Sequence, residues 1–310
     1  MTTFEIGHRF TENICMKKDY VLITPAYNEE KNIERLIKSV VAQTILPRKW
    51  IIVNDGSVDQ TGEIIAMYES KYDFIQNLPL ERENKAIESY YSRKTQVFLL
   101  GYKNIDNNLK YDFLGSLDAD LSFEPTYYEN MLKEFEANPR LGLAGGKYIY
   151  ELGGKIQKVL IDDTCVPGSL QLFRRQCYEQ IGGYVPLKYG GDDTLASITA
   201  RMRGWETRSF SRYQVIQHRP VGTAEKTILR AKFYQGFTEY GVATHPLFLL
   251  AKSIRRMFLE KPYFFGSAAR MAGFLCAYIK GEQRKIPKPI VRFVRREQIR
   301  RLFSVFGKAE

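Results

Sequence analysis

Cysteines and long apolar runs are both scarce in this sequence of 310 residues. The 4 cysteines lie far apart, so they form neither a zinc-binding pattern nor a disulfide framework, and we expect reduced thiols. The longest run without Asp, Glu, Lys or Arg is 12 residues, 240–251, whereas a helix that crosses a bilayer takes about 20 predominantly apolar residues. Residues 1–20 are mixed and polar and show no signal peptide. These scarcities predict a cytoplasmic protein without a membrane-spanning helix.

Acidic residues are scarce in only one part of the chain. Residues 201–310 contain 23 Lys and Arg against 7 Asp and Glu, while residues 1–200 contain 23 against 28. The net charge of +11 is therefore produced by the C-terminal third. A polyanionic surface, either phospholipid headgroups or nucleic acid, is a reasonable partner for that third. The rest of the chain needs no such partner.

Short apolar runs alternate with helical patterns along the first part of the chain. Residues 19–24 and 49–53 are apolar runs that end in polar loops, and apolar residues in 33–41 recur at the spacing of one helix face. A further helix is expected over 81–96, ahead of an apolar run at 97–102. The alternation predicts an α/β fold with a mostly parallel sheet flanked by helices. In such sheets ligands bind outside the carboxyl ends of the strands.

Two pairs of carboxylates add a chemical signal. Asp118 and Asp120 end an apolar run one residue apart, and like charges at this spacing persist most easily when a divalent cation lies between them. The alternative for an isolated Asp-x-Asp is a solvated turn or a helix cap. Asp192 and Asp193 open a predicted helix, where negative charge is favourable, so simple capping explains this pair when it is taken alone.

The ordered set of motifs resembles the inverting glycosyltransferases of family 2 with the GT-A fold. The resemblance spans roughly residues 20–220, and its segments follow the family's order. They are ITPAYNEE at 23–30, VNDGSVDQT at 53–61, LDAD at 117–120, FRRQCYEQIGGY at 173–184, Asp192-Asp193 followed by Arg203-Gly204-Trp205, and His218. The remaining chain, from HRPVGT onward, is similar to bacterial enzymes of surface or exopolysaccharide assembly.

The resemblance implies a nucleotide site at the ends of the first two strands. The backbone around Pro25 and Ala26, together with Tyr27 and Glu29, would hold the nucleotide. Asp55 would accept a hydrogen bond from the base imide. That acceptor favours a uracil-like ring, so a UDP-sugar is the implied donor.

The resemblance also implies a metal centre and a general base. Asp120 would hold Mg²⁺ or Mn²⁺ against the diphosphate, with Asp118 on the ribose or on a metal-bound water, and His218 would complete the metal shell. Asp193 would remove a proton from the acceptor hydroxyl as that oxygen attacks the anomeric carbon. Asp192, which stands where the family has glutamate, is the alternative base.

Two further segments concern the donor. Gly168 and Ser169 would lie near the donor sugar, where small residues let the backbone approach closely. The family often carries a Lys-Asn-x-Gly type segment on the helix before its Asp-x-Asp. This chain has SRKTQ at 92–96 instead, so Arg93 is the substitute there.

We expect a catalytic domain over 1–222 and a basic helical region over 223–310. The helical region is either a packed subdomain or a set of helices lying among the headgroups of an anionic membrane, at the inner face of the plasma membrane. The expected acceptor is a glycan or a lipid-linked hydroxyl, and no nucleic acid is expected. Two alternatives compete. A nucleotidyltransferase usually has a basic Gly-rich loop where this chain has acidic PAYNEE, and a nucleic-acid binder would leave the acidic front unexplained.

Overall fold

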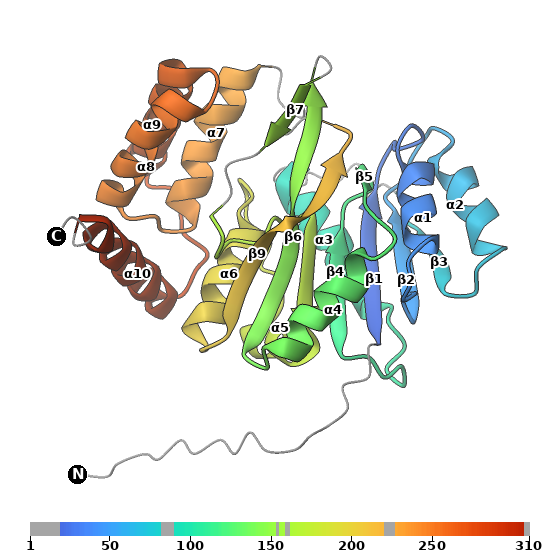
Figure 1. Ribbon diagram of the computed structural model, residues 1–310. Helices are drawn as coiled ribbons and strands as arrows, with labels where there is room; N and C mark the ends of the chain where they lie inside the picture. Colours follow the sequence, from blue (N-terminus) through green and yellow to red (C-terminus); the bar gives the residue numbers. More distant parts are fainter. Residues whose placement is uncertain (1–18, 82–89, 153–154, 159–161, 220–226, 307–310) are drawn as a thin grey trace, which may run out of the picture.

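The computed structural model of the protein describes residues 19–81, 90–152, 155–158, 162–219 and 227–306. Within these residues one nine-stranded sheet runs in the order β3-β2-β1-β4-β8-β6-β9-β5, and β7 pairs with β6 beside this path (Figure 1). The strands are β1 (Tyr20–Ala26), β2 (Lys49–Asn54), β3 (Ile75–Pro79), β4 (Phe113–Leu117), β5 (Leu121–Ser122), β6 (Leu141–Leu152), β7 (Lys155–Lys158), β8 (Leu170–Arg174) and β9 (Glu206–Gln217).

The half of the sheet that contains β3, β2, β1 and β4 is parallel. Its central strands are apolar on both faces and almost completely buried, as strands covered by helices on both sides must be. The helices here are α1 (Ile33–Val41), α2 (Thr61–Glu69) and α3 (Tyr90–Lys103). As the apolar spacing predicted, α1 buries one face against the sheet. Because the strands are parallel, the loops that follow β1, β2 and β4 open at one edge.

The other half of the sheet differs from the predicted parallel order. Strand β8 pairs antiparallel with β4 and with β6, and β5 pairs antiparallel with β9, while β6 and β9 are parallel. The α/β class is confirmed, but "mostly parallel" describes the first half alone. The helices of this half are α4 (Tyr127–Ala137), α5 (Arg175–Ile181) and α6 (Asp192–Met202). Local sequence patterns do not determine the direction of a strand, which depends on long connections.

Helix α3 and strand β3 also differ from expectation. The helix predicted over 81–96 is described from Tyr90 and continues to Lys103, so the apolar run 97–102 is helical and packs on β1 and β2. Residues 82–89 lie outside the described residues. Strand β3 was not predicted, because its sequence IQNLP lacks a long apolar run.

The C-terminal part, 227–306, consists of the helices α7 (Ile228–Gly241), α8 (Pro246–Leu259), α9 (Tyr263–Ile279) and α10 (Lys288–Phe306). We call this part the tail. The predicted boundary between 222 and 223 falls outside the described residues. None of the helices that the structure describes is long and apolar enough to cross a membrane.

Helices α7 and α9 cross at two glycines. A Cβ atom on Gly273 would lie 1.9 Å from the carbonyl oxygen of Phe233, and one on Gly236 would lie 2.2 Å from the carbonyl oxygen of Arg270. Gly266, earlier in α9, faces Lys232, earlier in α7, so the two helices run in the same direction. Helix α8 runs back from the end of α7 to the start of α9 and packs on α9. The start of α7 and the α8–α9 turn therefore lie at the same end of the tail, the upper end in Figure 1.

Helix α10 joins the tail to the part of the chain that contains the sheet, 19–219. Glu297 on α10 forms an ion pair of 2.7 Å with Arg201 on α6. Beside this pair, a hydrophobic cluster joins α6 and α10 through Leu195, Ile198, Ile290 and Val294. The tail is thus a packed helical unit, as one of the two sequence alternatives expected.

Candidate active site

The loops after β1 and β2 are bound to each other at the carboxyl edge of the sheet. The backbone N–H of Asp55 donates to the carbonyl oxygen of Ala26 at 2.8 Å, and that of Glu29 donates to Thr61 Oγ1 at 2.7 Å. Asn28 takes a left-handed backbone conformation, with φ of 51°, between these two contacts. Tyr27 remains 37% exposed, so its ring is open to a ligand. The predicted nucleotide residues are thus brought together on one edge.

Asp55 is buried against Arg93 of α3. The Nε of Arg93 lies 2.9 Å from each carboxylate oxygen of Asp55, and a guanidinium Nη also donates to Oδ1. The sequence considered Arg93 only as a substitute for a family segment. The structure pairs it with Asp55 instead, so a base that reaches this point meets an ion pair rather than a lone carboxylate. The role of Asp55 toward the base stays a prediction.

Asp118 and Asp120 lie directly after β4, as predicted. The Nζ of Lys94 lies 2.6 Å from Asp118 Oδ1 and donates to Oδ2 at 2.8 Å. Asp120 is 4% exposed, and its burial, together with the charge of Asp118, raises its pKa to about 6. Burial therefore disfavours the charged form of Asp120 at this position.

Buried oxygens without a hydrogen-bond donor gather around this pair. They are Ser169 Oγ and Gln217 Oε1, and the Nε2 of Gln217 donates to Asp120 Oδ2 at 3.3 Å. Buried polar atoms are normally satisfied, so such a cluster points to a ligand, water or ion. Carboxylate and amide oxygens are the hard ligands that Mg²⁺ and Mn²⁺ take. The residues present fit the predicted metal.

His218 lies beside the pair, but its ring is engaged elsewhere. Its backbone N–H donates to the carbonyl oxygen of Asp120 at 2.9 Å, while its Nε2 lies 2.7 Å from Ser122 Oγ. Burial and the charge of Arg35 lower the pKa of His218, which keeps the imidazole neutral. No group of three or more His, Cys, Asp or Glu suited to a metal occurs in the part of the chain that the structure describes.

Arg219 follows His218 and connects the two sides of the site. Its guanidinium is ion-paired with the buried Glu29, and its Nε lies 3.6 Å from Asp120 Oδ2. The sequence analysis missed this residue as well as Lys94 and Gln217. In the sequence, these three residues could have been found only from their positions next to motif residues. The residues that they contact are far away in the chain.

The predicted base is held next to the predicted donor-sugar loop. The N–H of Gly168 donates to Asp193 Oδ2 at 3.0 Å, and a Cβ atom at Gly168 would lie 2.8 Å from that of Asp193. The next residue, Ser169, accepts the N–H of Asp118 on its carbonyl at 2.9 Å. Burial raises the pKa of Tyr148, and the charges of Asp193 and Asp118 raise it further. The structure thus joins the two carboxylate pairs through one short loop.

Asp192 differs from its neighbour in its surroundings. Its pKa is raised to about 6, first by burial and then by the charge of Asp193, while Lys94 and the hydroxyl of Thr95 favour its charged form. Helix α6 begins after Gly191, whose φ of 96° suits glycine. Capping alone therefore does not describe this pair, because Lys94 lies between it and Asp118.

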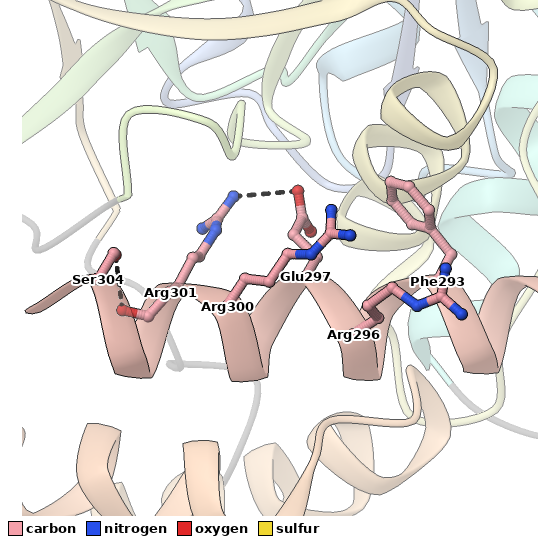
Figure 2. Close-up of a pocket in the computed structure, with 6 residues that line it drawn as sticks. All are labelled: Phe293, Arg296, Glu297, Arg300, Arg301 and Ser304. Atoms are coloured by element: carbon pink, nitrogen blue, oxygen red, sulfur yellow. Dashed lines mark hydrogen bonds and ion pairs between the residues drawn. The ribbon is translucent and has the colours of Figure 1, made fainter. Parts of the chain in front are cut away.

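The two cavities recorded in the described residues lie away from this site. One, of about 380 Å³, is lined by residues of the tail and of the loop 187–190. The other, of about 340 Å³, lies along α10 between Phe293 and Ser304 (Figure 2). The candidate active site is therefore defined by its contacts and its buried polar atoms.

Comparison with known proteins agrees with this arrangement. Residues 21–90 match the family model described as Glycosyl transferase family 2. The poly-beta-1,6-N-acetyl-D-glucosamine synthase of Staphylococcus epidermidis is 29% identical over 121 residues, which are 39% of this chain and 26% of that protein. The chain thus spans about a quarter of the length of this curated relative.

Solved structures share the fold over most of the chain. The mannosyltransferase PcManGT from Pyrobaculum calidifontis, in complex with GDP-Man and Mn²⁺, has a TM-score of 0.55 at 16% identity, covering 89% of this chain and 82% of its own. TarS 1-349 of Staphylococcus aureus, in complex with UDP-GlcNAc, has a TM-score of 0.55 at 14% identity, covering 89% and 78%. These neighbours define the fold as GT-A. The match of residues 21–90 to the family model and the similarity to the curated relative support the resemblance to glycosyltransferase family 2 found in the sequence.

Proposed function

We propose that this protein is an inverting glycosyltransferase of bacterial surface polysaccharide synthesis. It moves a sugar from a nucleotide-diphosphate donor, with UDP-sugars favoured, to a hydroxyl of a glycan or lipid-linked acceptor. The observation that carries the proposal is the continuous set of contacts from Asp118 through Ser169 and Gly168 to Asp193. This set joins a diphosphate-type site to a carboxylate base. A relative named as a poly-N-acetylglucosamine synthase and a structural neighbour with UDP-GlcNAc support the donor class.

Asp118 and Asp120 would hold Mg²⁺ or Mn²⁺, with Gln217 contributing an amide oxygen and His218 close by. The bound cation would neutralise charge on the diphosphate leaving group. Arg219 and Lys94 provide fixed positive charge on either side of the carboxylates. These two cations attract the diphosphate and orient it toward the loop of Gly168 and Ser169.

Asp193 is the proposed general base. Its Oδ2 accepts the N–H of Gly168, which fixes the carboxylate against the loop. The acceptor hydroxyl gives its proton to this carboxylate while its oxygen bonds to the anomeric carbon, and the bond from that carbon to the diphosphate breaks. A single displacement inverts the anomeric centre. Asp192 is the alternative, since a carboxylate with a pKa of about 6 is better matched to accept a proton near neutral pH.

A donor screen tests the proposal. Turnover of UDP and GDP sugars is measured with Mg²⁺ and with Mn²⁺, and UDP-sugar hydrolysis or transfer is expected with either metal. Thermal stabilisation by UDP with Mn²⁺ is compared with stabilisation by single-stranded RNA, since a ligand that binds only the native state raises its melting temperature. Release of pyrophosphate from a nucleoside triphosphate and a sugar phosphate, without transfer from any nucleotide sugar, would instead identify a nucleotidyltransferase.

A further inference from the structure

Large apolar side chains are exposed at one end of the tail. Phe258 is 73% exposed, Phe265 is 69% exposed and Ile228 is 67% exposed. The same end carries further exposed apolar residues at the start of α7 and around the α8–α9 turn. Together these residues form what we call the apolar tip: Ile228, Leu229, Phe258, Leu259, Tyr263, Phe264 and Phe265. A contiguous exposed apolar patch of this kind marks an interaction surface.

The helix packing gathers these residues although they are up to 37 positions apart in the chain. Helices α7 and α9 are parallel, so their first residues lie at the same end. Helix α8 runs back along α9, where Ser267 Oγ donates to the carbonyl oxygen of Ser253 at 2.9 Å. Figure 1 shows this end of the tail at the top, on the side toward which β1 points its carboxyl end. The apolar tip and the active-site edge therefore face the same way.

The charges at the apolar tip are almost all positive. Arg230, Arg255 and Lys261 are exposed there. The acid of the α8–α9 turn, Glu260, is ion-paired with Lys232 and hydrogen-bonded to Arg256 and Arg270. Burial would raise the pKa of Glu260, but these cations lower it to about 2, so its charge is neutralised inside the tail. The surface at the tip is thus apolar and cationic.

Helix α10 is basic but lacks a comparable apolar surface. Its Glu297 and Arg301 face the catalytic part and are bound to Arg201 and Asp162, and Figure 2 shows the contact between Glu297 and Arg301. Phe303, which is 70% exposed, is the large apolar side chain that projects from α10 in the described residues. Helix α10 can therefore attract an anionic surface by its charge, but it offers few apolar side chains that could insert into a membrane.

We propose that the apolar tip inserts into the headgroup and upper acyl region of a bilayer with anionic lipids. Aromatic and aliphatic side chains with flanking cations are the chemistry of an interfacial membrane contact. This inference rests on the proposed function in one respect: it places the active-site edge toward the bilayer, so the acceptor class that fits is a lipid-linked glycan. The sequence analysis gave the membrane contact as an alternative for the whole helical region 223–310, whereas the geometry points to the end of the tail formed by α7, α8 and α9.

The test is flotation of the full chain with liposomes of phosphatidylglycerol and phosphatidylcholine, against liposomes of phosphatidylcholine alone. The parent should float with the anionic liposomes, and high salt should weaken this. The double variant Phe258→Ser/Phe265→Ser should lower the partition coefficient about tenfold or more, because it removes two inserting rings. Phe303→Ser is the matched control, since it removes an equally exposed ring outside the tip, and it should float like the parent.

Equal flotation of the parent and the double variant would overturn the proposal, as would loss of flotation with Phe303→Ser alone. Light scattering tests the alternative that a second copy of the chain buries the apolar tip. A parent protein that dimerises through the tip and does not float with liposomes would support that alternative and overturn the proposal. Hydrolysis of UDP-sugars in solution is measured in parallel and should be unchanged in the double variant. A parent that floats but uses no nucleotide sugar would remove the proposed function and leave the membrane contact standing.

Discussion

The catalytic part, 19–219, and the tail, 227–306, treat charged and apolar side chains in opposite ways. In the described residues the tail exposes fourteen large apolar side chains, whereas the much longer catalytic part exposes seven. Each of the four acids in the described tail is ion-paired: Glu239, Glu260, Glu282 and Glu297. The catalytic part instead buries Asp120 beside Asp118 and leaves nearby oxygens without donors. The catalytic part therefore keeps buried polar groups that a ligand could bind. The tail instead pairs its acids and leaves apolar side chains exposed.

The largest expected effect is on the buried carboxylates. Asp120→Asn should abolish metal-dependent UDP binding, because it removes the charge that a divalent cation requires. Since burial raises the pKa of Asp120 to about 6, its ionised form lowers stability at neutral pH, and the variant should melt at the parent's temperature or above. Calorimetric UDP titration with Mn²⁺ and a melting curve measure both. The control is Asp73→Asn, at an exposed acid far from the site. Normal UDP binding by Asp120→Asn would show that the buried carboxylates of the catalytic part do not bind a ligand.

The second effect separates binding from chemistry. Asp193→Asn should keep donor binding and lose transfer by ~10²-fold or more, the loss typical of removing a general base. Initial rates of transfer and donor affinity are measured for this variant and for Asp192→Asn. A larger loss of rate in Asp192→Asn would assign the base to Asp192. Equal loss of affinity and rate in both variants would return the pair to capping α6.

The third effect tests whether the tail depends on close helix contact. Gly273→Ala would place a methyl group 1.9 Å from the carbonyl oxygen of Phe233 in the present backbone, so α7 and α9 must move apart. Such overpacking should lower the free energy of unfolding by about 1–3 kcal/mol. Gly241→Ala is the control, because a Cβ atom there meets nothing within 4 Å. Urea denaturation measures both. Equal stability of the two variants would show that the crossing of α7 and α9 adapts freely.

The smallest effect is the pH dependence of the paired acids. The pKa of Glu260 falls from 4.5 to about 2 on folding, so its ion pairs contribute stability above pH 4.5, and this contribution is lost as the pH falls toward 2. The melting temperature of Glu260→Gln should therefore lie below that of the parent at pH 6, and the difference should shrink as the pH falls through this window. Glu282→Gln, at a pair 3.4 Å apart, is the control and should show a smaller difference at pH 6. A difference that grows in acid would contradict the assignment.

The apolar spacing in the sequence was sufficient to predict helices and strands whose formation depends on nearby residues. Helix α1 and strand β1 follow from periodicity, and the place of Asp118 and Asp120 follows from the end of a strand. Direction and partner choice were not predictable. Strand β8 pairs antiparallel with β4 although β5, β6 and β7 lie between them in the chain, and Arg219 reaches Glu29 from 190 positions away. The two alternatives for the tail do not exclude each other, since helices that pack on one face can expose another.

The parallel arrangement of α7 and α9 has a consequence for how the tail folds. Two parallel neighbours need a connection as long as themselves, and α8 is that connection: it packs on α9 and is ion-paired with α7 through Lys252 and Glu239. A chain cut within α9 would leave Gly236 and the face around it without the backbone against which they pack. We therefore expect α7, α8 and α9 to open and close as one cooperative unit in hydrogen exchange, with no stable intermediate that keeps two of the three.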